Sequence, residues 1–298
     1  MSDRYSSKTT NSGNQNRRSS FQMSSTTFEA IRGDLYKLTG IYYTDNKKYL
    51  LESRIQRRID ELKLSSFEDY HKLINSFNGR DELNKLFDAI TINETYFFRA
   101  EFQFEAFENV LAPEIIKKTA SYKKTMRIWS AASSSGEEAY TIAMIIDYKL
   151  KSRFPDVNFE IIASDINETV IESAKKGEYK DYAIRNIPPD YMRKYFTKKG
   201  SLYTISDKIK KMVEFKKINL YDPISVRKAG RIDIAWCCNV LIYFDIPSKQ
   251  KVVKSLYEAI NSNGYLFIGY SESLHGITND FKLVHLPKAM AYQKIEKR

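Results

Sequence analysis

From about residue 124 onward, short apolar runs of β-strand character alternate with segments of helical periodicity. Strands are predicted for MRIWSAA (126–132), NFEIIASDIN (158–167), IDIAWCCNVLIYF (232–244), GYLFIGY (264–270) and KLVHLPKAMAYQKI (282–295). Helices are predicted for 137–150, 167–177 and 248–262. The run at 232–244 is apolar nearly throughout, which is typical of a strand buried on both faces. The alternation predicts an α/β fold: a mostly parallel sheet, covered by helices, with its site at the carboxyl ends of the strands.

The first hundred residues follow a different, mostly helical pattern. Residues 1–25 are rich in Ser, Thr, Asn and Arg and almost free of apolar side chains, so we expect a disordered tail. Helices are predicted from about residue 27 to 40, and over 47–63, 67–77 and 80–90. We therefore expect a small all-helical domain at 26–105, followed by the α/β domain at 106–298.

A basic segment interrupts the alternation between about residues 175 and 217. It contains 13 Lys and Arg against 5 Asp and Glu, a net charge of +8. Within it, SLYTIS (201–206) and MVEFKKINL (212–220) have the pattern of short strands. We expect an inserted β-subdomain at about 185–217.

The composition narrows the class of protein. With 298 residues, 42% of them hydrophobic, the chain can bury a sizeable core. No stretch holds the roughly 18 uncharged apolar residues of a membrane-spanning helix, and the N-terminus lacks the apolar centre of a secretory signal. The two cysteines, Cys237 and Cys238, are adjacent and no Cys/His metal spacing occurs, so we expect a cytoplasmic protein without a metal site. The net charge of +11 leaves nucleic acid, an anionic membrane and an acidic protein open as partners.

Features at the ends of the first two predicted strands indicate a bound nucleoside. The turn SSSGEE (133–138) joins strand to helix through small residues, which lets a ligand approach backbone N–H groups at the helix N-terminus. Asp165 ends the next strand, where a carboxylate can bind both hydroxyls of a ribose. The alternatives are a purely structural turn and an N-cap role for Asp165. The lone Gly136 does not give the glycine spacing of NAD sites.

Two further segments place polar residues among apolar ones. NETYFFR (93–99) lies where the helical part meets the α/β part, and WCCNVLIYF (236–244) ends a buried strand with an Asn and a Tyr. Either segment could line a site, and the alternatives are interdomain packing for the first and plain core for the cysteines. The histidines, His71, His275 and His285, are scattered, so a serine-hydrolase or metal-hydrolase function has no support.

Together, five segments of this chain resemble one family, the chemotaxis receptor methyltransferases (CheR). The segments are TINETYFFRAEFQF, RIWSAASSSGEEAYTIAMI, IIASDINETVIESAKKGEY, IDIAWCCNVLIYFD and GYLFIGYSESL, in the family's order and spacing across roughly residues 28–295. The resemblance implies a Rossmann-like class I methyltransferase domain, a small all-helical N-terminal domain and an inserted small antiparallel β-subdomain. It also implies S-adenosylmethionine-dependent O-methylation of glutamate side chains of chemotaxis receptors for sensory adaptation, with S-adenosylhomocysteine as the product.

The resemblance also implies roles for individual residues. Cofactor-binding residues are implied at Asn93, Thr95, Arg99, Glu138, Asp165, Asn219, Leu220, Cys237, Cys238 and Asn239. Arg99 and Tyr243 are implied as the catalytic residues that orient the acceptor, and no general base is expected because a glutamate is already ionised at pH 7. Cys238 stands where the family usually has Arg, so one contact with cofactor or substrate is expected to differ.

The implied partner is the acidic methylation region of a chemotaxis receptor. Arg54, Arg57 and Arg58, on one face of the helix predicted at 47–63, are expected to bind it; the alternative is an ordinary solvated face. We expect a cytoplasmic monomer, peripheral to membrane receptor arrays, that neither inserts into the membrane nor binds nucleic acid. Two other functions stay open: a non-catalytic adenosylmethionine- or nucleotide-binding regulator of the array, and a nucleic-acid methyltransferase, which would explain the basic charge.

Overall fold

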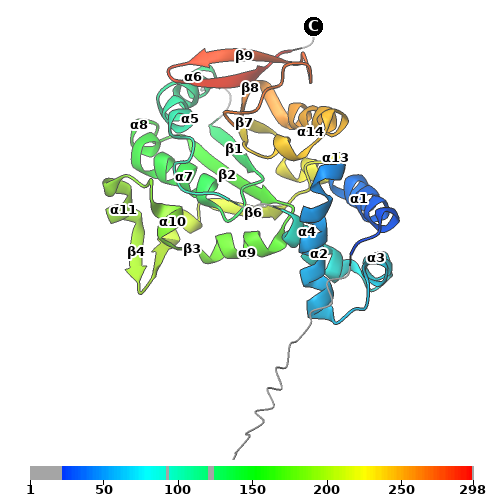
Figure 1. Cartoon of the computed structure of the whole chain (residues 1–298). Helices are drawn as coiled ribbons and strands as arrows, with labels where there is room; N and C mark the ends of the chain where they lie inside the picture. Colours follow the sequence, from blue (N-terminus) through cyan, green and yellow to red (C-terminus); the bar gives the residue numbers. More distant parts are fainter. Residues whose placement is uncertain (1–21, 92–93, 120–123, 297–298) are drawn as a thin grey trace, which may run out of the picture.

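A seven-stranded sheet forms the centre of the larger part of the molecule (Figure 1). The structure is a computed structural model that describes residues 22–91, 94–119 and 124–296. The strands of this sheet are β1 (Thr125–Ala131), β2 (Asn158–Asp165), β6 (Val213–Lys217), β7 (Ile232–Cys237), β8 (Ile260–Ile268), β9 (Phe281–Leu286) and β10 (Ala289–Lys294). Their order is β6-β2-β1-β7-β8-β10-β9; the first five are parallel, and β10 is antiparallel to both its neighbours. The predicted α/β fold with a mostly parallel sheet is confirmed.

Helices cover both faces of the sheet because its central strands are apolar on both faces. Neighbouring residues of β1 point in opposite directions, so Ile128 packs under α7 and Trp129 packs under α14. The helical elements on the sheet are α5 (Glu101–Ala106), η2 (Phe107–Leu111), α6 (Ala112–Thr119), α7 (Glu137–Ile145), η3 (Ile146–Leu150), α8 (Lys151–Arg153), α13 (Pro223–Val226), η4 (Arg227–Ala229), η5 (Leu241–Tyr243) and α14 (Ile246–Ala259). The helix predicted to end at residue 262 ends instead at Ala259, because β8 begins at the next residue.

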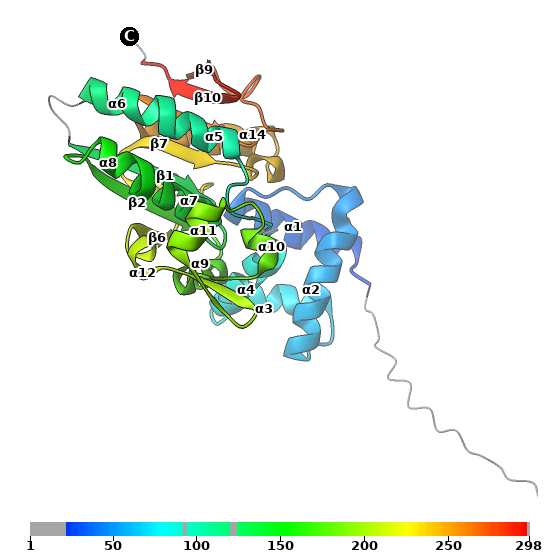
Figure 2. The ribbon, with the colours of Figure 1, turned by 90° about the vertical axis from the view of Figure 1, so that its left-hand side faces the viewer.

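The N-terminal helices form a separate bundle with its own core on one side of the sheet (Figures 1 and 2). They are α1 (Ser25–Thr39), η1 (Asp45–Lys47), α2 (Lys48–Leu62), α3 (Phe67–Ile74) and α4 (Arg80–Ile90). The helices predicted here are found within a few residues of their expected bounds. Within the described residues, every helix is too short or too polar to span a bilayer.

The predicted N-terminal tail extends too far into the ordered chain. Residues 1–21 lie outside the described residues, but Met23 is buried in the core of the bundle. Ser24 caps α1, because its side chain accepts a hydrogen bond from the backbone N–H of Thr27 at 3.1 Å. Met23 and Ser24 therefore belong to the helical bundle.

The expected domain boundary at 105/106 falls inside a continuous helical run, α5-η2-α6, for which the sequence analysis predicted no element. Phe104 and Phe107 of this run pack against Trp236 of β7, with ring centroids 6.2 Å and 5.2 Å apart. The core of the bundle ends with Ile90, whereas the core on the sheet begins with Phe97. The packing thus places the boundary between the two hydrophobic cores between these two residues.

The small second sheet differs from the β-subdomain expected at about 185–217. It consists of β3 (Glu178–Tyr179), β5 (Leu202–Ile205) and β4 (Phe196–Lys199), in that order and antiparallel. The segment predicted as its second strand is β6, which instead pairs in parallel with β2 at the edge of the main sheet, so this part of the prediction was wrong. The pairing satisfies the backbone groups on the edge of β2 and buries Val213. Helices α9 (Glu168–Lys176), α10 (Asp181–Ile184), α11 (Pro189–Tyr195) and α12 (Asp207–Lys210) complete this region.

Backbone pairing joins the helical bundle to the loop after β7. Ile41 and Phe244 form an antiparallel β-bridge, and the backbone N–H of Tyr42 donates to the carbonyl of Tyr243 at 3.0 Å. Nearby, the hydroxyl of Tyr36 donates to the carboxylate of Asp245 at 3.0 Å. These contacts fix the bundle against the carboxyl ends of the strands.

Arg58 of α2 is an internal residue of the bundle. Its guanidinium donates two hydrogen bonds of 2.8 Å to the two carboxylate oxygens of Glu82, which is buried and also accepts one from Tyr70 at 3.0 Å. Arg57, the neighbouring residue, is exposed. The two arginines therefore differ in environment although both were expected to bind the partner.

Replacing Arg58 by Ala should destabilise the bundle by about 3 kcal/mol, because the Glu82 carboxylate would be left buried without its cation. Arg57→Ala is the matched control and should change the free energy of unfolding by less than about 0.5 kcal/mol. Denaturant unfolding of both variants measures the difference. Equal stability of the two variants would show that the Arg58–Glu82 pair contributes nothing net.

Candidate functional site

A deep cleft lies at the carboxyl ends of β1, β2 and β7, where the helical bundle meets the sheet. It encloses roughly 1150 Å³, part of it open to solvent, which is enough for a cofactor-sized ligand. Its walls are formed by Thr39, Ile41, Ile90, Thr91, Glu94, Thr95, Tyr96, Arg99, Ala100, Phe104, Ala132, Ser133, Ser134, Glu138, Asp165, Ile166, Ile218, Asn219, Leu220, Cys238, Asn239, Val240, Tyr243 and Phe244. The cleft is thus built from both parts of the chain.

The turn between β1 and α7 forms one wall through its backbone. Ala132 and Ser134 have left-handed φ angles of 60° and 50°, and Gly136 precedes α7 with φ 93°. A Cβ atom on Gly136 would lie 3.0 Å from the Cβ of Ala174, so glycine is needed both for its conformation and for space. The small residues of the predicted turn therefore bring the chain tightly around the N-terminus of α7, next to the cleft.

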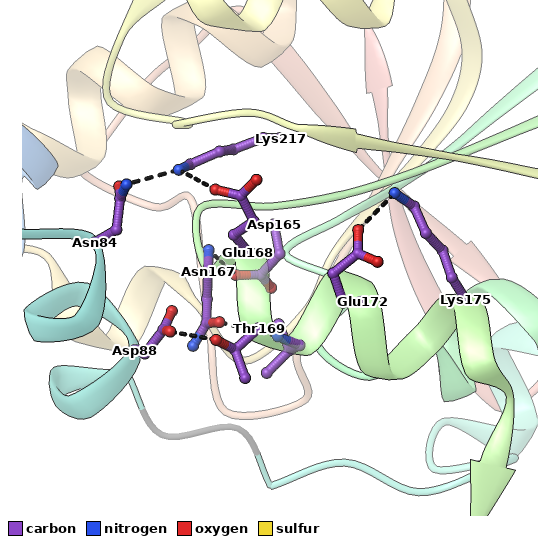
Figure 3. Close-up of polar contacts among 10 residues, drawn as sticks. Asn84, Asp88, Asp165, Asn167, Glu168, Thr169, Glu172, Lys175 and Lys217 are labelled. Atoms are coloured by element: carbon purple, nitrogen blue, oxygen red, sulfur yellow. Dashed lines mark hydrogen bonds and ion pairs between the residues drawn. The ribbon is translucent and has the colours of Figure 1, made fainter. Parts of the chain in front are cut away.

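Asp165 lies at the end of β2 with a buried carboxylate in the cleft wall (Figure 3). Its Oδ2 accepts a hydrogen bond from the backbone N–H of Ser134 at 2.9 Å, and its Oδ1 accepts one from Asn167 at 3.0 Å. Burial raises the pKa of Asp165, and the backbone donors oppose this rise. The N-cap of α9 is Asn167, whose side chain accepts from Val170 N–H, so the alternative N-cap role for Asp165 does not hold.

Helix α4 of the bundle contacts the start of α9, which follows Asp165, and the end of β6 (Figure 3). Asp88 accepts a hydrogen bond from the hydroxyl of Thr169. Lys217 donates to Asn84 Oδ1 and to Glu168 Oε2, both at 3.0 Å. The bundle therefore supports the elements next to Asp165 as well as closing the cleft.

Glu137 and Glu138 begin α7 but face different surroundings. Glu138 lines the cleft, and its Oε1 accepts a hydrogen bond from Ser130 Oγ at 2.6 Å. Burial raises the pKa of Glu138 to about 7; Arg99 lowers it and Glu272 adds to the rise. Glu137 is buried outside the cleft wall against the Ser135 hydroxyl, and burial also raises its pKa to about 7.

The segment Glu94–Arg99 forms the mouth of the cleft. Thr95, Tyr96 and Arg99 all line it, and the Arg99 guanidinium donates to the carbonyl of Glu94 at 2.8 Å. Arg99 is exposed and lies 5.7 Å from the centre of the Tyr96 ring. Asn93, also predicted to bind the cofactor, lies outside the described residues.

The loop after β7 forms the opposite wall. Cys238, Asn239 and Tyr243 line the cleft, but Cys237 is fully buried and does not, which fits the alternative of plain core for this cysteine. The thiol of Cys238 donates to Gln103 Oε1 at 3.4 Å. Burial raises the pKa of the Tyr243 hydroxyl, so it stays protonated and can donate a hydrogen bond.

Asn219 and Leu220, for which the resemblance implies cofactor binding, line the cleft next to the bundle. The side-chain amide of Asn219 donates to the carbonyl of Leu38 at 2.7 Å, and its oxygen accepts from Tyr221 N–H at 3.0 Å. Asn219 therefore fixes the joint between the two parts of the chain, and Leu220 offers an apolar surface to the cleft.

The three arginines expected on one partner-binding face of α2 are separated by their contacts. Arg54 donates to the hydroxyl of Tyr43 at 3.2 Å and to the carbonyl of Ile90, and Arg58 is paired with Glu82. The side chains of Arg54 and Arg58 therefore bind polar atoms inside the bundle. Helical periodicity places both on one face of α2 but does not show that the fold covers this face. Arg57 alone of the three is exposed.

Sequence reasoning missed Glu272, which holds the loop after β7 in place. Its Oε2 accepts from the backbone N–H of Asn239 at 2.8 Å and of Gly269 at 2.6 Å, and its Oε1 accepts from Ile242 N–H at 3.2 Å. Asn239 has a left-handed φ of 61°, a conformation that these hydrogen bonds stabilise. The only signal was the segment GYSESL (269–274), whose acidic residue had no evident partner.

Comparisons with known proteins agree with this division of the chain. Residues 26–91 match the family described as CheR methyltransferase, all-alpha domain, and residues 93–290 match CheR methyltransferase, SAM binding domain. Chemotaxis protein methyltransferase 2 of Vibrio cholerae is 34% identical over 91% of this chain and 94% of its own length. Chemotaxis protein methyltransferase Cher2 of Pseudomonas putida is 33% identical over 89% of this chain and 97% of its own. The chemotaxis protein methyltransferase of Borreliella burgdorferi is 33% identical, with coverages of 82% and 87%.

Replacing Glu272 by Gln should destabilise the protein by about 2 kcal/mol, because one amide NH₂ would face a backbone N–H that needs an acceptor. Thermal unfolding measures this loss. Glu101→Gln, at an exposed position of α5, is a control that should leave the melting temperature within about 1 °C of the parent. An unchanged melting temperature in E272Q would contradict the role given to the carboxylate.

Proposed function

The chain belongs to the CheR family of chemotaxis methyltransferases, and from this premise we propose that it methylates glutamate side chains of chemotaxis receptors. It is an S-adenosylmethionine-dependent methyltransferase. The observation that carries the proposed acceptor is that Arg99 and Tyr243 both line the cleft that also contains Asp165 and Glu138. Two hydrogen-bond donors for a carboxylate thus share one cleft with the residues suited to the cofactor.

The cleft fits S-adenosylmethionine by the chemistry of its donors and acceptors. The Asp165 carboxylate accepts backbone hydrogen bonds from Ser134 and Asn167, and since a carboxylate has about four lone-pair sites it can also accept from ribose hydroxyls. Glu138 provides a carboxylate for the positive charge of the cofactor, and Leu220 and Ile166 provide apolar surface for its base. When bound, the cofactor supplies an electrophilic methyl group.

The protein's own part is to orient the acceptor and to exclude water. A glutamate carboxylate is ionised at pH 7, so it needs no general base to become nucleophilic. Arg99 has one N–H bond to the Glu94 carbonyl, which leaves donors that can hold the acceptor carboxylate. Tyr243 is half-buried and protonated, so it can donate to the same group while the surrounding apolar residues displace water.

Charge supports an acidic protein as the partner. The chain has a net charge of +11, and the exposed Arg57 on α2 adds a cation on the bundle that forms one side of the cleft. An acceptor region rich in glutamate would be attracted to this surface. We propose that the enzyme acts at the cytoplasmic methylation region of receptors, at the periphery of receptor arrays, as a monomer.

Incubation with labelled S-adenosylmethionine and receptor-containing membranes tests the activity. We expect label on a receptor-sized band that base releases as methanol, as a carboxyl methyl ester does. Tyr243→Phe should lower kcat about 30-fold and Arg99→Ala about 100-fold, because each removes a donor that orients the acceptor.

Tyr42→Phe is the matched control for Tyr243→Phe, since Tyr42 pairs with the same loop only through its backbone. Its turnover should equal that of the parent. Label in nucleic acid and none in receptors would contradict the proposed acceptor, and near-normal turnover of both cleft variants would contradict the proposed roles.

The raised pKa of Glu138 predicts how cofactor affinity depends on pH. The positive cofactor favours the ionised carboxylate, so affinity should rise from pH 6 to 8, through the pKa of about 7, and then level off. Glu138→Gln should remove this rise and weaken binding about tenfold at pH 8, as measured by calorimetry.

Glu137→Gln separates this effect from burial alone, because the pKa of Glu137 is also raised to about 7 but its side chain lies outside the cleft wall. This variant should keep the rise in affinity. A pH profile in Glu138→Gln that matches the parent would refute the assignment.

A further inference from the structure

Arg185, beyond the mouth of the cleft, lies between two aromatic rings. Its guanidinium carbon is 3.5 Å from the centre of the Tyr96 ring and 3.8 Å from that of Tyr182. The two ring centroids are 6.3 Å apart. The guanidinium also donates to the backbone carbonyl of Tyr182. Arg185 therefore has a defined position although it is exposed on the surface.

The two rings border the guanidinium on two sides, with their planes inclined at 80° to each other. N–H donors lie in the plane of the group, and one of the five bonds to the Tyr182 carbonyl. Within the described residues, no acidic side chain forms an ion pair with Arg185. The remaining donors form a fork that matches a carboxylate from another molecule.

Tyr96 connects this arginine to the cleft. One side of Tyr96 faces Arg185, Arg99 lies 5.7 Å from the centre of the same ring, and Tyr96 and Arg99 both line the cleft. The hydroxyl of Tyr182 donates to the carboxylate of Glu94, which fixes the outer ring to the same segment. The two guanidinium carbons are thus no more than about 9 Å apart, a span of one to two turns of an α-helix.

We propose that Arg185 determines acceptor specificity by binding a second carboxylate of the acceptor protein, one or two helical turns from the glutamate that is methylated. This inference rests on the proposed function. Arg99 would hold the acceptor glutamate in the cleft, and Arg185 would hold an acidic neighbour on the same face of the acceptor helix. An isolated glutamate then binds weakly, and a glutamate with a correctly spaced acidic neighbour is selected.

The aromatic contacts give this site its selectivity. An ordinary surface arginine loses rotamer freedom when it binds, whereas the rings of Tyr96 and Tyr182 already restrict Arg185. A lysine would keep the charge but not the planar fork or the stacking. Arg185 is therefore a recognition residue outside the group that contacts the cofactor.

The experiment measures methylation kinetics of the full-length enzyme on the cytoplasmic fragment of a receptor that the parent enzyme methylates. Arg185→Gln should raise KM for the fragment five- to tenfold and leave kcat within twofold, because it removes binding and not the chemistry. Arg185→Lys should raise KM about twofold. S-adenosylmethionine binding, measured by calorimetry, should be unchanged in both variants.

Arg153→Gln is the matched control. Arg153 is also exposed, lies 5.5 Å from an aromatic ring, that of Phe154, and donates to a backbone carbonyl, that of Glu108. It lies at the C-terminal end of the continuous helix α7-η3-α8, whose N-terminus is at the cleft, roughly 25 Å away along the helix axis. Its substitution should leave KM unchanged.

A second set of variants identifies the carboxylate. Acidic residues of the fragment within two turns of the methylated glutamate are replaced by their amides, one at a time. For the parent enzyme, one of these replacements should raise the KM for the fragment five- to tenfold. For the Arg185→Gln enzyme, the same replacement should leave the KM unchanged, because the contact is already lost.

Each outcome has a distinct meaning. If the parent enzyme places no base-labile label on the fragment, the proposed function fails. If the fragment is methylated, two outcomes refute the role of Arg185. One is that Arg185→Gln has the same KM as the parent enzyme, and the other is that every acidic replacement raises KM by the same factor in Arg185→Gln as in the parent.

Discussion

The cleft depends on the pairing of two backbone segments that are about 200 residues apart in the sequence. Ile41 and Phe244 form a β-bridge, and Tyr42 bonds to Tyr243 beside it. Ile41, Tyr243 and Phe244 all line the cleft. Neither the bundle nor the sheet encloses a ligand alone, because each supplies one wall. The bridge therefore decides whether the residues at the carboxyl ends of the strands face solvent or an enclosed site.

Carboxylates that accept backbone hydrogen bonds organise the loops of this protein. Glu272 accepts three backbone hydrogen bonds, and Asp165 accepts backbone hydrogen bonds from the turn between β1 and α7 and from the residues that follow it. Such bonds hold the walls in place before a ligand arrives, which reduces the cost of ordering the site on binding. Burial opposes ionisation at Asp165 and Glu138, so the arrangement depends on the donors that face them. The same few carboxylates thus hold the loops of the cleft in position and give the cleft its negative charge.

The sequence was sufficient for features that depend on local pattern. Strand–helix alternation predicted the sheet, and Asp165 could be placed at the site because carboxyl ends of parallel strands converge. Features that depend on distant partners could not be predicted. Arg58 looks like a surface residue until Glu82 is placed against it, and Glu272 gains its role only when Gly269 and Asn239 become neighbours. The strand at Val213 resembled part of the basic insert because its pairing partner, β2, lies some 50 residues earlier.

The pairing of basic residues with acidic ones determines which cations an approaching partner meets. Arg58 is neutralised by Glu82, and Lys217 by Glu168, so these cations contribute little to the field that an approaching protein experiences. Ionic strength acts on exposed charges within a Debye length of the partner, about 8 Å in physiological salt. The net charge of +11 already counts Glu82 and Glu168, so removing these pairs leaves the excess unchanged and assigns it to other residues. The salt dependence of the association rate therefore reflects exposed groups such as Arg57 and Arg185.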